Sequence, residues 1–213
     1  MIPNPGETER PDESDLTGNQ IAVRKDLPFL LATGEQRGSN SIRLTWERVK
    51  GCSGYEVYWA YCGQNRIYQK IETVKSNGKR SITYKKLKGN RAYKFYVVAY
   101  KIMNGKKNYL AKSPTIHVAM RQSKFTNAKY VTVNKTKLTL KKGKTFRIKA
   151  KAAAENRRKK LLSHADKFRY YTSDKRVATV TEKGKIKAKK KGVCTIYVVA
   201  NNGVTKKIKV TVK

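Results

Sequence analysis

The residue types that most often carry out catalysis are few in this chain and widely scattered. Its two histidines, His117 and His164, lie far apart, and neither stands in a Ser-His-Asp order or a metal-binding pair. Residues 124–213 hold four acidic side chains, too dispersed for a calcium site or a glycosidase carboxylate pair. We therefore expect no catalytic residue, no metal ligand and no cofactor, and we predict that the chain is not an enzyme. The four acidic residues are Glu155, Asp166, Asp174 and Glu182.

Three cysteines offer thiol chemistry, but their spacing does not favour it. Cys52 and Cys62 stand on either side of a predicted strand from Tyr55 to Tyr61. At about 3.3 Å per residue, that strand separates them far beyond bridging distance. Cys194 alternates with apolar residues of another predicted strand, so its side chain should point into a core. None has the CxxC spacing of a metal or redox site, and we expect all three to be free.

Basic side chains are the most abundant chemical feature. The chain has 50 Lys and Arg against 14 Asp and Glu, a net charge of +36, and residues 124–213 carry 28 basic and four acidic side chains of that total. Such a field attracts polyanions and is screened beyond about 8 Å at physiological salt. We predict contact with an anionic polymer such as teichoic acid or an acidic glycan; the alternative is a solvated Lys-rich surface without a ligand. Nucleic acid is disfavoured, because no helix-turn-helix, zinc-finger or RNA-binding motif accompanies the charge. The candidate contact residues are Arg157, Arg158, Lys159, Lys160, Lys187, Lys189, Lys190 and Lys191.

Short strands separated by turn residues must position these side chains. At 213 residues and 38% apolar residues, the chain is long enough for two small cores, and it holds no 18-residue apolar run. Residues 1–27 are acidic and rich in Pro and Gly, without the basic start and apolar stretch of a secretory signal, and we expect them to be disordered. Alternation predicts strands in the first half at 41–46, 54–61, 66–74, 81–85, 93–101 and 115–120.

The second half of the chain resembles the group 2 bacterial immunoglobulin-like domain. Strands at 177–180, 186–188 and 195–198 are separated by turns at Gly184 and Gly192, and the segments 131–148 and 205–212 look like the family's opening and closing strands. The resemblance covers 127–213. Residues 152–167 depart from it as an insertion, where an alanine-rich run favours a helical turn or two.

The first half, 28–121, resembles a fibronectin type III domain. Trp46, the alternation Tyr55-x-Val57 and the run 93–99 stand where that family has its core strands. Leu87 and Tyr93 match the tyrosine corner, in which the Tyr hydroxyl bonds a backbone group across a turn. Gly89 replaces the usual Pro of that corner. Residues 121–126 are then a short polar linker.

The resemblance to fibronectin type III implies that strands 54–61 and 93–101 pair. If Tyr55, Val57, Trp59 and Tyr61 face the core, the side chains between them share the opposite face with those of the second strand. We expect that face to be exposed and to bind a partner, either the other domain, another module or a glycan that stacks on tyrosine. The alternative is cross-strand pairing that stabilises the sheet. The candidate residues are Tyr58, Tyr96 and Tyr100.

Together these observations predict an all-β protein with two tandem immunoglobulin-like β-sandwiches after a disordered segment. The resemblances imply a non-catalytic adhesion or spacer module, extracellular or on the surface of a Gram-positive type of cell. Its expected partner is a wall or envelope polymer, a glycan or a protein, and we expect a monomer without a transmembrane segment. Two alternatives stay open, namely the accessory region of a secreted polysaccharide- or peptidoglycan-acting hydrolase, and a phage or particle decoration protein.

Overall fold

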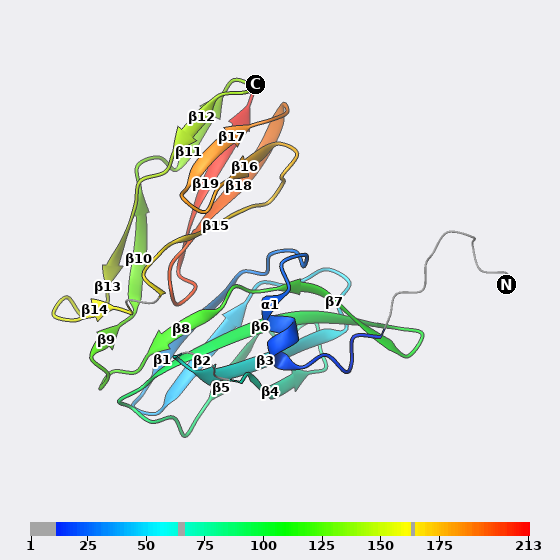
Figure 1. Ribbon diagram of the computed structural model, residues 1–213, viewed down its shortest axis with the longest axis vertical. Helices are drawn as coiled ribbons and strands as arrows, with labels where there is room; N and C mark the ends of the chain where they lie inside the picture. Colours follow the sequence, from blue (N-terminus) through cyan, green and yellow to red (C-terminus); the bar gives the residue numbers. More distant parts are fainter. Residues whose placement is uncertain (1–11, 64–66, 163–164) are drawn as a thin grey trace.

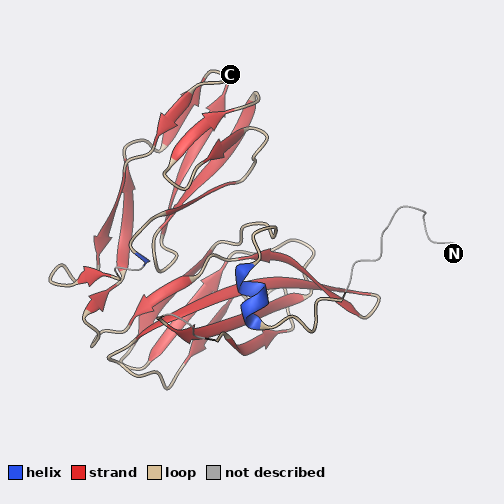
Figure 2. Ribbon diagram, in the orientation of Figure 1, coloured by secondary structure: helices blue, strands red, loops and turns tan. Residues whose placement is uncertain are grey.

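The computed structural model describes residues 12–63, 67–162 and 165–213, which form two tandem β-sandwiches and a short helix (Figure 1, Figure 2). The predicted all-β fold class is confirmed. The second sandwich rises steeply from one end of the first (Figure 1). The expectations for residues 1–11, for Arg66 and for His164 lie outside the described residues. Within the described ranges, no helix has the length and apolar character needed to cross a membrane.

The first sandwich encloses its core between two sheets. One sheet has the order β1 (Ala32–Arg37), β2 (Ser41–Trp46), β5 (Ser81–Tyr84). The other has the order β4 (Gln69–Val74), β3 (Gly54–Tyr61), β6 (Ala92–Met103), β7 (Lys106–Lys112), and β8 (Ile116–Ala119) also pairs with β6. Alternation decides which side chains enter the core, as predicted for both β3 and β6. The buried core includes Ile42, Leu44, Tyr55, Val57, Tyr93, Phe95, Val97 and Ala99.

The predicted tyrosine corner is present. The backbone N–H of Lys88 donates to the Tyr93 hydroxyl at 2.7 Å, and that hydroxyl donates to the Lys88 carbonyl at 3.3 Å. Leu87 is buried beside them. Because the corner closes without proline, these two hydrogen bonds hold the turn before β6 in place.

The second sandwich packs a four-stranded sheet against a three-stranded sheet. The first has the order β11 (Lys137–Leu140), β19 (Thr205–Val212), β18 (Gly192–Val199), β15 (Arg169–Thr172), with β11 parallel to β19. The second has the order β12 (Thr145–Arg147), β17 (Lys185–Ala188), β16 (Ala178–Val180). Cys194 lies in the core between them, as predicted. Its core neighbours include Ile186, Ile196, Ile208 and Val210.

The helical turn or two expected from the alanine-rich run at 152–162 is wrong. Residues Ala150–Ala154 form β13, which pairs antiparallel with β10 (Ala128–Val133). Lys160–Leu161 form β14, which pairs parallel with β9 (Phe125–Thr126) in the segment expected to be a short polar linker. Ala150 and Ala152 pack against the core. Strand pairing and burial therefore override the helix propensity of alanine.

The disorder expected over residues 1–27 is wrong for residues 12–27. Helix α1 (Gly18–Val23) begins with a capping box, in which Gln20 N–H donates to the Thr17 hydroxyl and the Gln20 side chain accepts from Thr17 N–H at 2.8 Å. A helix this short is marginal by itself in water. It is stable here because Ile21 is fully buried against the first sandwich.

Candidate functional site

The tyrosines predicted to share one sheet face do so. Strands β3 and β6 pair with Tyr58 opposite Tyr96 and Gly54 opposite Tyr100. The rings of Tyr58 and Tyr96 stack with centroids 4.8 Å apart. The expected exposure, however, is wrong, because Tyr58, Tyr96 and Tyr100 are 4%, 1% and 5% exposed. A ligand could therefore reach these three side chains only if the residues that cover them moved away.

The N-terminal segment, residues 12–27, covers the tyrosine face. Ile21 packs on the rings, and the Tyr96 hydroxyl donates to the Gly18 carbonyl at 2.6 Å. Asn19 accepts a hydrogen bond from the backbone N–H of Tyr68 at 2.8 Å. The alternation of β3 and β6 does not indicate this cover. The sequence signal that indicates the helix is the capping box Thr17-x-x-Gln20.

Acidic residues attach the beginning of this segment to the edge of β7. The backbone N–H of Glu13 donates to the Lys107 carbonyl at 2.9 Å, and the Lys107 N–H donates to Asp12 at 3.0 Å. The Glu13 carboxylate accepts from the Tyr109 N–H and forms a 2.6 Å ion pair with Arg24. The carboxylates of Asp12 and Glu13 therefore hold the segment on β7 through backbone N–H groups.

A buried carboxylate, Glu56, lies on the same face of the sheet. Its two oxygens accept from the hydroxyls of Tyr58 (2.9 Å) and Tyr109 (2.8 Å) and from the ammonium groups of Lys70 (3.1 Å) and Lys107 (3.0 Å). Burial raises the pKa of Glu56, but these four donors together outweigh it and hold the pKa below its usual 4.5. Burial and the nearby Glu56 charge raise the pKa of Tyr109.

The Glu56 cluster is built to hold charge rather than to transfer a proton. Its carboxylate is 0% exposed and is already occupied by four donors. A general base must reach a substrate proton within hydrogen-bond distance. We therefore interpret the cluster as the polar support of the β3–β6–β7 surface and of the segment docked on it.

The two predicted basic clusters are not brought together. Lys160 pairs with Phe125 beside the domain junction, whereas the loop 189–191 lies at the other end of the sandwich, where Gly192 pairs with Val212. Lys159 has a structural role instead, because its ammonium donates to the carbonyls of Arg121 and Ser123, both at 2.6 Å. The remaining candidates of both clusters are exposed: Arg157, Arg158, Lys160, Lys187, Lys189, Lys190 and Lys191.

A second basic loop, 141–144, joins the loop 189–191. The Gly143 N–H donates to the Ala188 carbonyl at 3.0 Å, and the Ala188 N–H donates to the Lys144 carbonyl at 3.0 Å. Lys141, Lys142 and Lys144 are exposed. The sequence signal for this loop was the run Lys-Lys-Gly-Lys, which resembles the turn Lys-Lys-Lys-Gly at 189–192.

Thiol and imidazole groups meet once among the described residues. The Cys62 sulfur lies 3.4 Å from Nδ1 of His117. Burial raises the pKa of Cys62 to about 12, so the thiol stays protonated at neutral pH and is a poor nucleophile. All three cysteines are free, as predicted. Within residues 12–63, 67–162 and 165–213, no group of three or more His, Cys, Asp or Glu side chains is placed to hold a metal ion.

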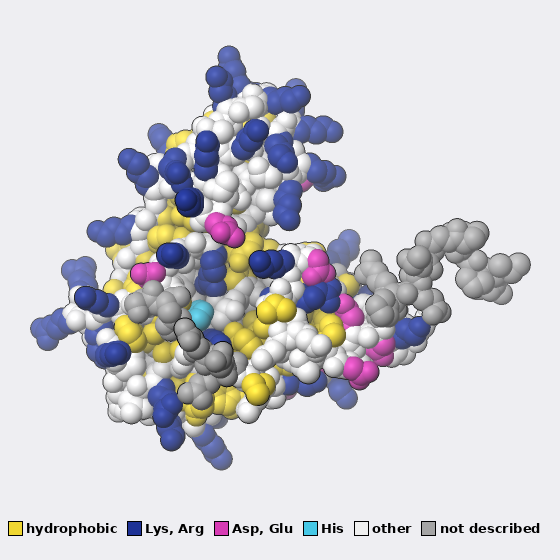
Figure 3. Space-filling view, in the orientation of Figure 1, with side chains coloured by type: hydrophobic (Ala, Val, Ile, Leu, Met, Phe, Trp, Pro, Cys, Tyr) yellow, Lys and Arg dark blue, Asp and Glu magenta, His cyan; other side chains and the backbone are white. Residues whose placement is uncertain are grey.

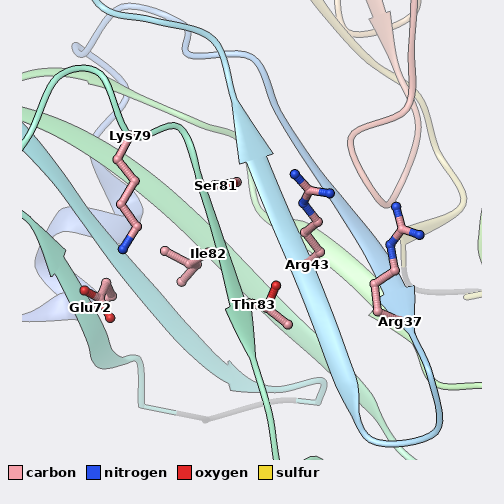
Figure 4. Close-up of a pocket in the computed structure, with 7 residues that line it drawn as sticks. All are labelled: Arg37, Arg43, Glu72, Lys79, Ser81, Ile82 and Thr83. Carbon is pink, nitrogen blue, oxygen red and sulfur yellow. The ribbon is translucent and has the colours of Figure 1, made fainter.

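A shallow depression lies on the outer face of the β1–β2–β5 sheet (Figure 4). Arg43 stands opposite Thr83 across β2 and β5, and Arg37 pairs with Glu35 at 3.0 Å. The guanidinium groups of Arg37 and Arg43 project away from Lys79 and Glu72 rather than toward a common point (Figure 4). Because all of its arginine and lysine side chains are exposed, the depression does not form an enclosed binding site.

The two domains are joined by more than a linker. The turn of the β18–β19 hairpin reaches the first sandwich, where the Asn202 carbonyl accepts from the Gly34 N–H and the Asn201 carbonyl from the His117 N–H, both at 2.8 Å. Gly34 lies in β1 and His117 in β8, so one turn bonds both sheets of the first sandwich. Gly203 lies so close to Ala32 that a Cβ there would be 2.1 Å from the Ala32 carbonyl oxygen.

Side chains reinforce this junction. The Arg169 guanidinium donates to the carbonyls of Thr115, Ala200 and Asn201, and burial lowers its pKa. Phe29 of the first domain stacks on Tyr171 of the second, with ring centroids 4.2 Å apart. The second domain therefore docks on the first through backbone, cationic and aromatic contacts. None of these contacts is visible in the local sequence pattern.

Family models match both halves of the chain. Residues 30–114 match the fibronectin type III domain, and residues 127–212 match the bacterial Ig-like domain (group 2). Among solved structures, one titled "Myokine structure" has 16% identity and a TM-score of 0.36, covering 44% of this chain and 97% of that one. The fn3 domain of human collagen alpha-1(XX) has 12% identity and a TM-score of 0.35, covering 46% and 89%. The search of curated proteins returned no match.

Proposed function

Because the chain is a fibronectin type III domain followed by a group 2 bacterial Ig-like domain, we propose that it is a non-catalytic spacer of a bacterial cell surface or wall. Modules of these two kinds are usually non-catalytic, and group 2 bacterial Ig-like domains are typical of extracellular bacterial proteins. The protein's own work is then mechanical and adhesive: it holds a fixed geometry and contacts the envelope through its charge.

The docked β18–β19 turn carries the spacer proposal. A flexible linker would let two sandwiches tumble independently, and domain motion is the default unless the interface is substantial. Here the turn bonds β1 and β8 at once, Arg169 bonds carbonyls of both domains, and the linker itself is paired as β9 with β14. A partner attached to either sandwich is then held in one direction relative to the other.

Charge supports the adhesive part of the proposal. The second domain is the more basic one, and Lys and Arg side chains stand out over its surface in Figure 3. An anionic wall polymer is the complementary partner. Contacts between exposed charges are weak individually and depend strongly on salt.

Sedimentation of the full chain with purified Gram-positive walls tests the envelope contact. The walls are used intact and after removal of teichoic acid, each across a salt series. We expect the bound fraction to fall with rising salt and to fall again when the teichoic acid is removed. Binding that ignores both changes would exclude an electrostatic contact.

A further inference from the structure

Two lysine-rich loops meet at the end of the second sandwich that is remote from the first (Figure 1). The loop 141–144 connects β11 to β12, and the loop 189–191 connects β17 to β18. Besides the two hydrogen bonds between Gly143, Ala188 and Lys144, the Lys189 N–H donates to the Val177 carbonyl at 2.9 Å, which fixes the second loop. Backbone bonds therefore set the loop positions, and the lysine side chains are not needed to hold them. We call Lys141, Lys142, Lys144, Lys189, Lys190 and Lys191 the lysine tip.

All six side chains of the lysine tip are exposed, and acidic neighbours do not neutralise them. The second domain has four carboxylates among the described residues. Asp174 is paired with Arg176 at 2.9 Å, and Glu182 lies in the turn at the opposite end of β17. Glu155 accepts from Asn127 beside the junction, and Asp166 precedes β15 at its junction end. The tip is therefore a local excess of positive charge as well as part of a basic domain.

We propose that the lysine tip is the site at which this protein binds a phosphodiester polymer of the teichoic acid kind. This deepens the envelope contact proposed above and rests on it. Lysine ammonium groups are compact point charges that accept phosphates in many orientations. A flexible polymer with phosphates along its length can meet several of them at once, without a shaped pocket.

The chemistry of the tip favours this polymer over a single-stranded nucleic acid. Proteins that bind single strands combine a basic groove with aromatic side chains on which the bases stack. Neither loop contains an aromatic residue, and the neighbouring exposed apolar side chain is Val193, which is 56% exposed. The tip supplies charge without a stacking platform.

The other basic cluster provides a matched control. Arg157, Arg158 and Lys160 are also exposed, but they lie beside the junction, and Glu155 is two positions before Arg157 in the chain. Replacing three tip lysines by glutamate (Lys189→Glu, Lys190→Glu, Lys191→Glu) changes the net charge by the same amount as Arg157→Glu, Arg158→Glu, Lys160→Glu. The two triple variants therefore remove the same amount of charge at different places, with two guanidinium groups and one ammonium group lost at the junction and three ammonium groups lost at the tip.

Binding of the full chain to purified teichoic acid, measured across a salt series, tests the site. Each phosphate contact contributes a salt slope of roughly 0.7 and, at physiological salt, about fourfold in affinity. The tip variant should therefore bind about fiftyfold more weakly and lose a slope of roughly 2, whereas the junction variant should change by less than about threefold. A milder variant, Lys141→Gln, Lys142→Gln, Lys144→Gln, replaces the glutamate variant if the glutamates perturb folding. It should also weaken binding to teichoic acid and lower the salt slope.

Each other outcome overturns a defined part of the proposal. Equal losses in both triple variants would mean that net charge alone drives binding, and the tip assignment would fail. Retention of the tip variant on whole walls as strongly as the wild type would remove the site but leave the envelope contact standing. A wild-type chain that binds neither walls nor teichoic acid would end both proposals. Tighter binding to single-stranded DNA than to teichoic acid would contradict the assigned partner.

Discussion

Replacing Gly203 with alanine should uncouple the two domains. Gly203 has φ +88°, and a Cβ there would lie 2.1 Å from the carbonyl oxygen of Ala32 and 2.8 Å from Cα of Thr33. Both of these are backbone atoms, so no side-chain rotation relieves the overlap. The hairpin turn must instead withdraw from β1. Its withdrawal breaks the hydrogen bonds that the Gly34 and His117 N–H groups donate to the turn.

The magnitude follows from the contacts that are lost. Two backbone hydrogen bonds contribute about 0.5–1.5 kcal/mol each, and the stacked pair Phe29 and Tyr171 about 0.5–1.5 kcal/mol. The docked arrangement should therefore lose about 1.5–4.5 kcal/mol, which lowers the ratio of docked to undocked molecules by about 10-fold to 2000-fold. Alanine in the left-handed region costs a further 1–2 kcal/mol or so, which a control must reproduce.

Gly143→Ala supplies that control. Gly143 also has a left-handed φ of +83° in the second domain, but no atom lies within 4 Å of the added Cβ. Small-angle X-ray scattering should give a larger and broader distribution of interatomic distances for Gly203→Ala alone. Calorimetry should show separate unfolding transitions for the two domains in that variant. If both variants scatter and unfold alike, the turn does not lock the junction.

Three further predictions concern the first domain. The lowered pKa of Glu56 means that its stabilising effect is complete above pH 4.5 and is lost as the pH falls through the folded-state pKa. Glu56→Gln should remove that acid-side dependence in urea denaturation and cost about 3–5 kcal/mol at pH 7, because Lys70 and Lys107 lose their partner. Gly18→Ala places a Cβ 2.7 Å from a backbone oxygen and should lift α1, so trypsin should cleave residues 12–27 faster than in the wild type. Tyr93→Phe removes both hydrogen bonds of the tyrosine corner and should lower the unfolding free energy by about 1–3 kcal/mol, and an unchanged urea midpoint would contradict this role.

Local patterns predicted much of the fold because their causes are local. Alternation along β3 and β6 requires that Tyr55 and Phe95 face one side and Tyr58 and Tyr96 the other, whatever covers each side. The tyrosine corner spans six residues, from Lys88 to Tyr93, so its chemistry is readable in one short segment. The alanine-rich run failed for the opposite reason, since its pairing with β10 is set by a strand about twenty residues away.

The candidate sites depended on contacts that the sequence pattern does not contain. The tyrosine face was predicted correctly as a set of residues but wrongly as a surface, because α1 reaches Tyr96 from 78 positions away. The lysine tip combines two loops that are far apart in the sequence, and the antiparallel pairing of β12 with β17 brings them together. Exposure and proximity are properties of the packed chain.

The sequence by itself determined two β-sandwiches, their order, their inward-facing residues and the strong positive charge of the second. The strands, their inward-facing residues and the charge follow from period-two alternation, turn residues and composition, which act over a few positions, and the two sandwich folds and their order follow from the resemblance to the two families. The tertiary structure alone decided that residues 12–27 cover the tyrosines, that Glu56 is held by four donors and that Gly203 lies against the backbone of Ala32 in the first domain. Those features arise when distant segments exclude water from a shared surface, and no local pattern specifies which segments will meet.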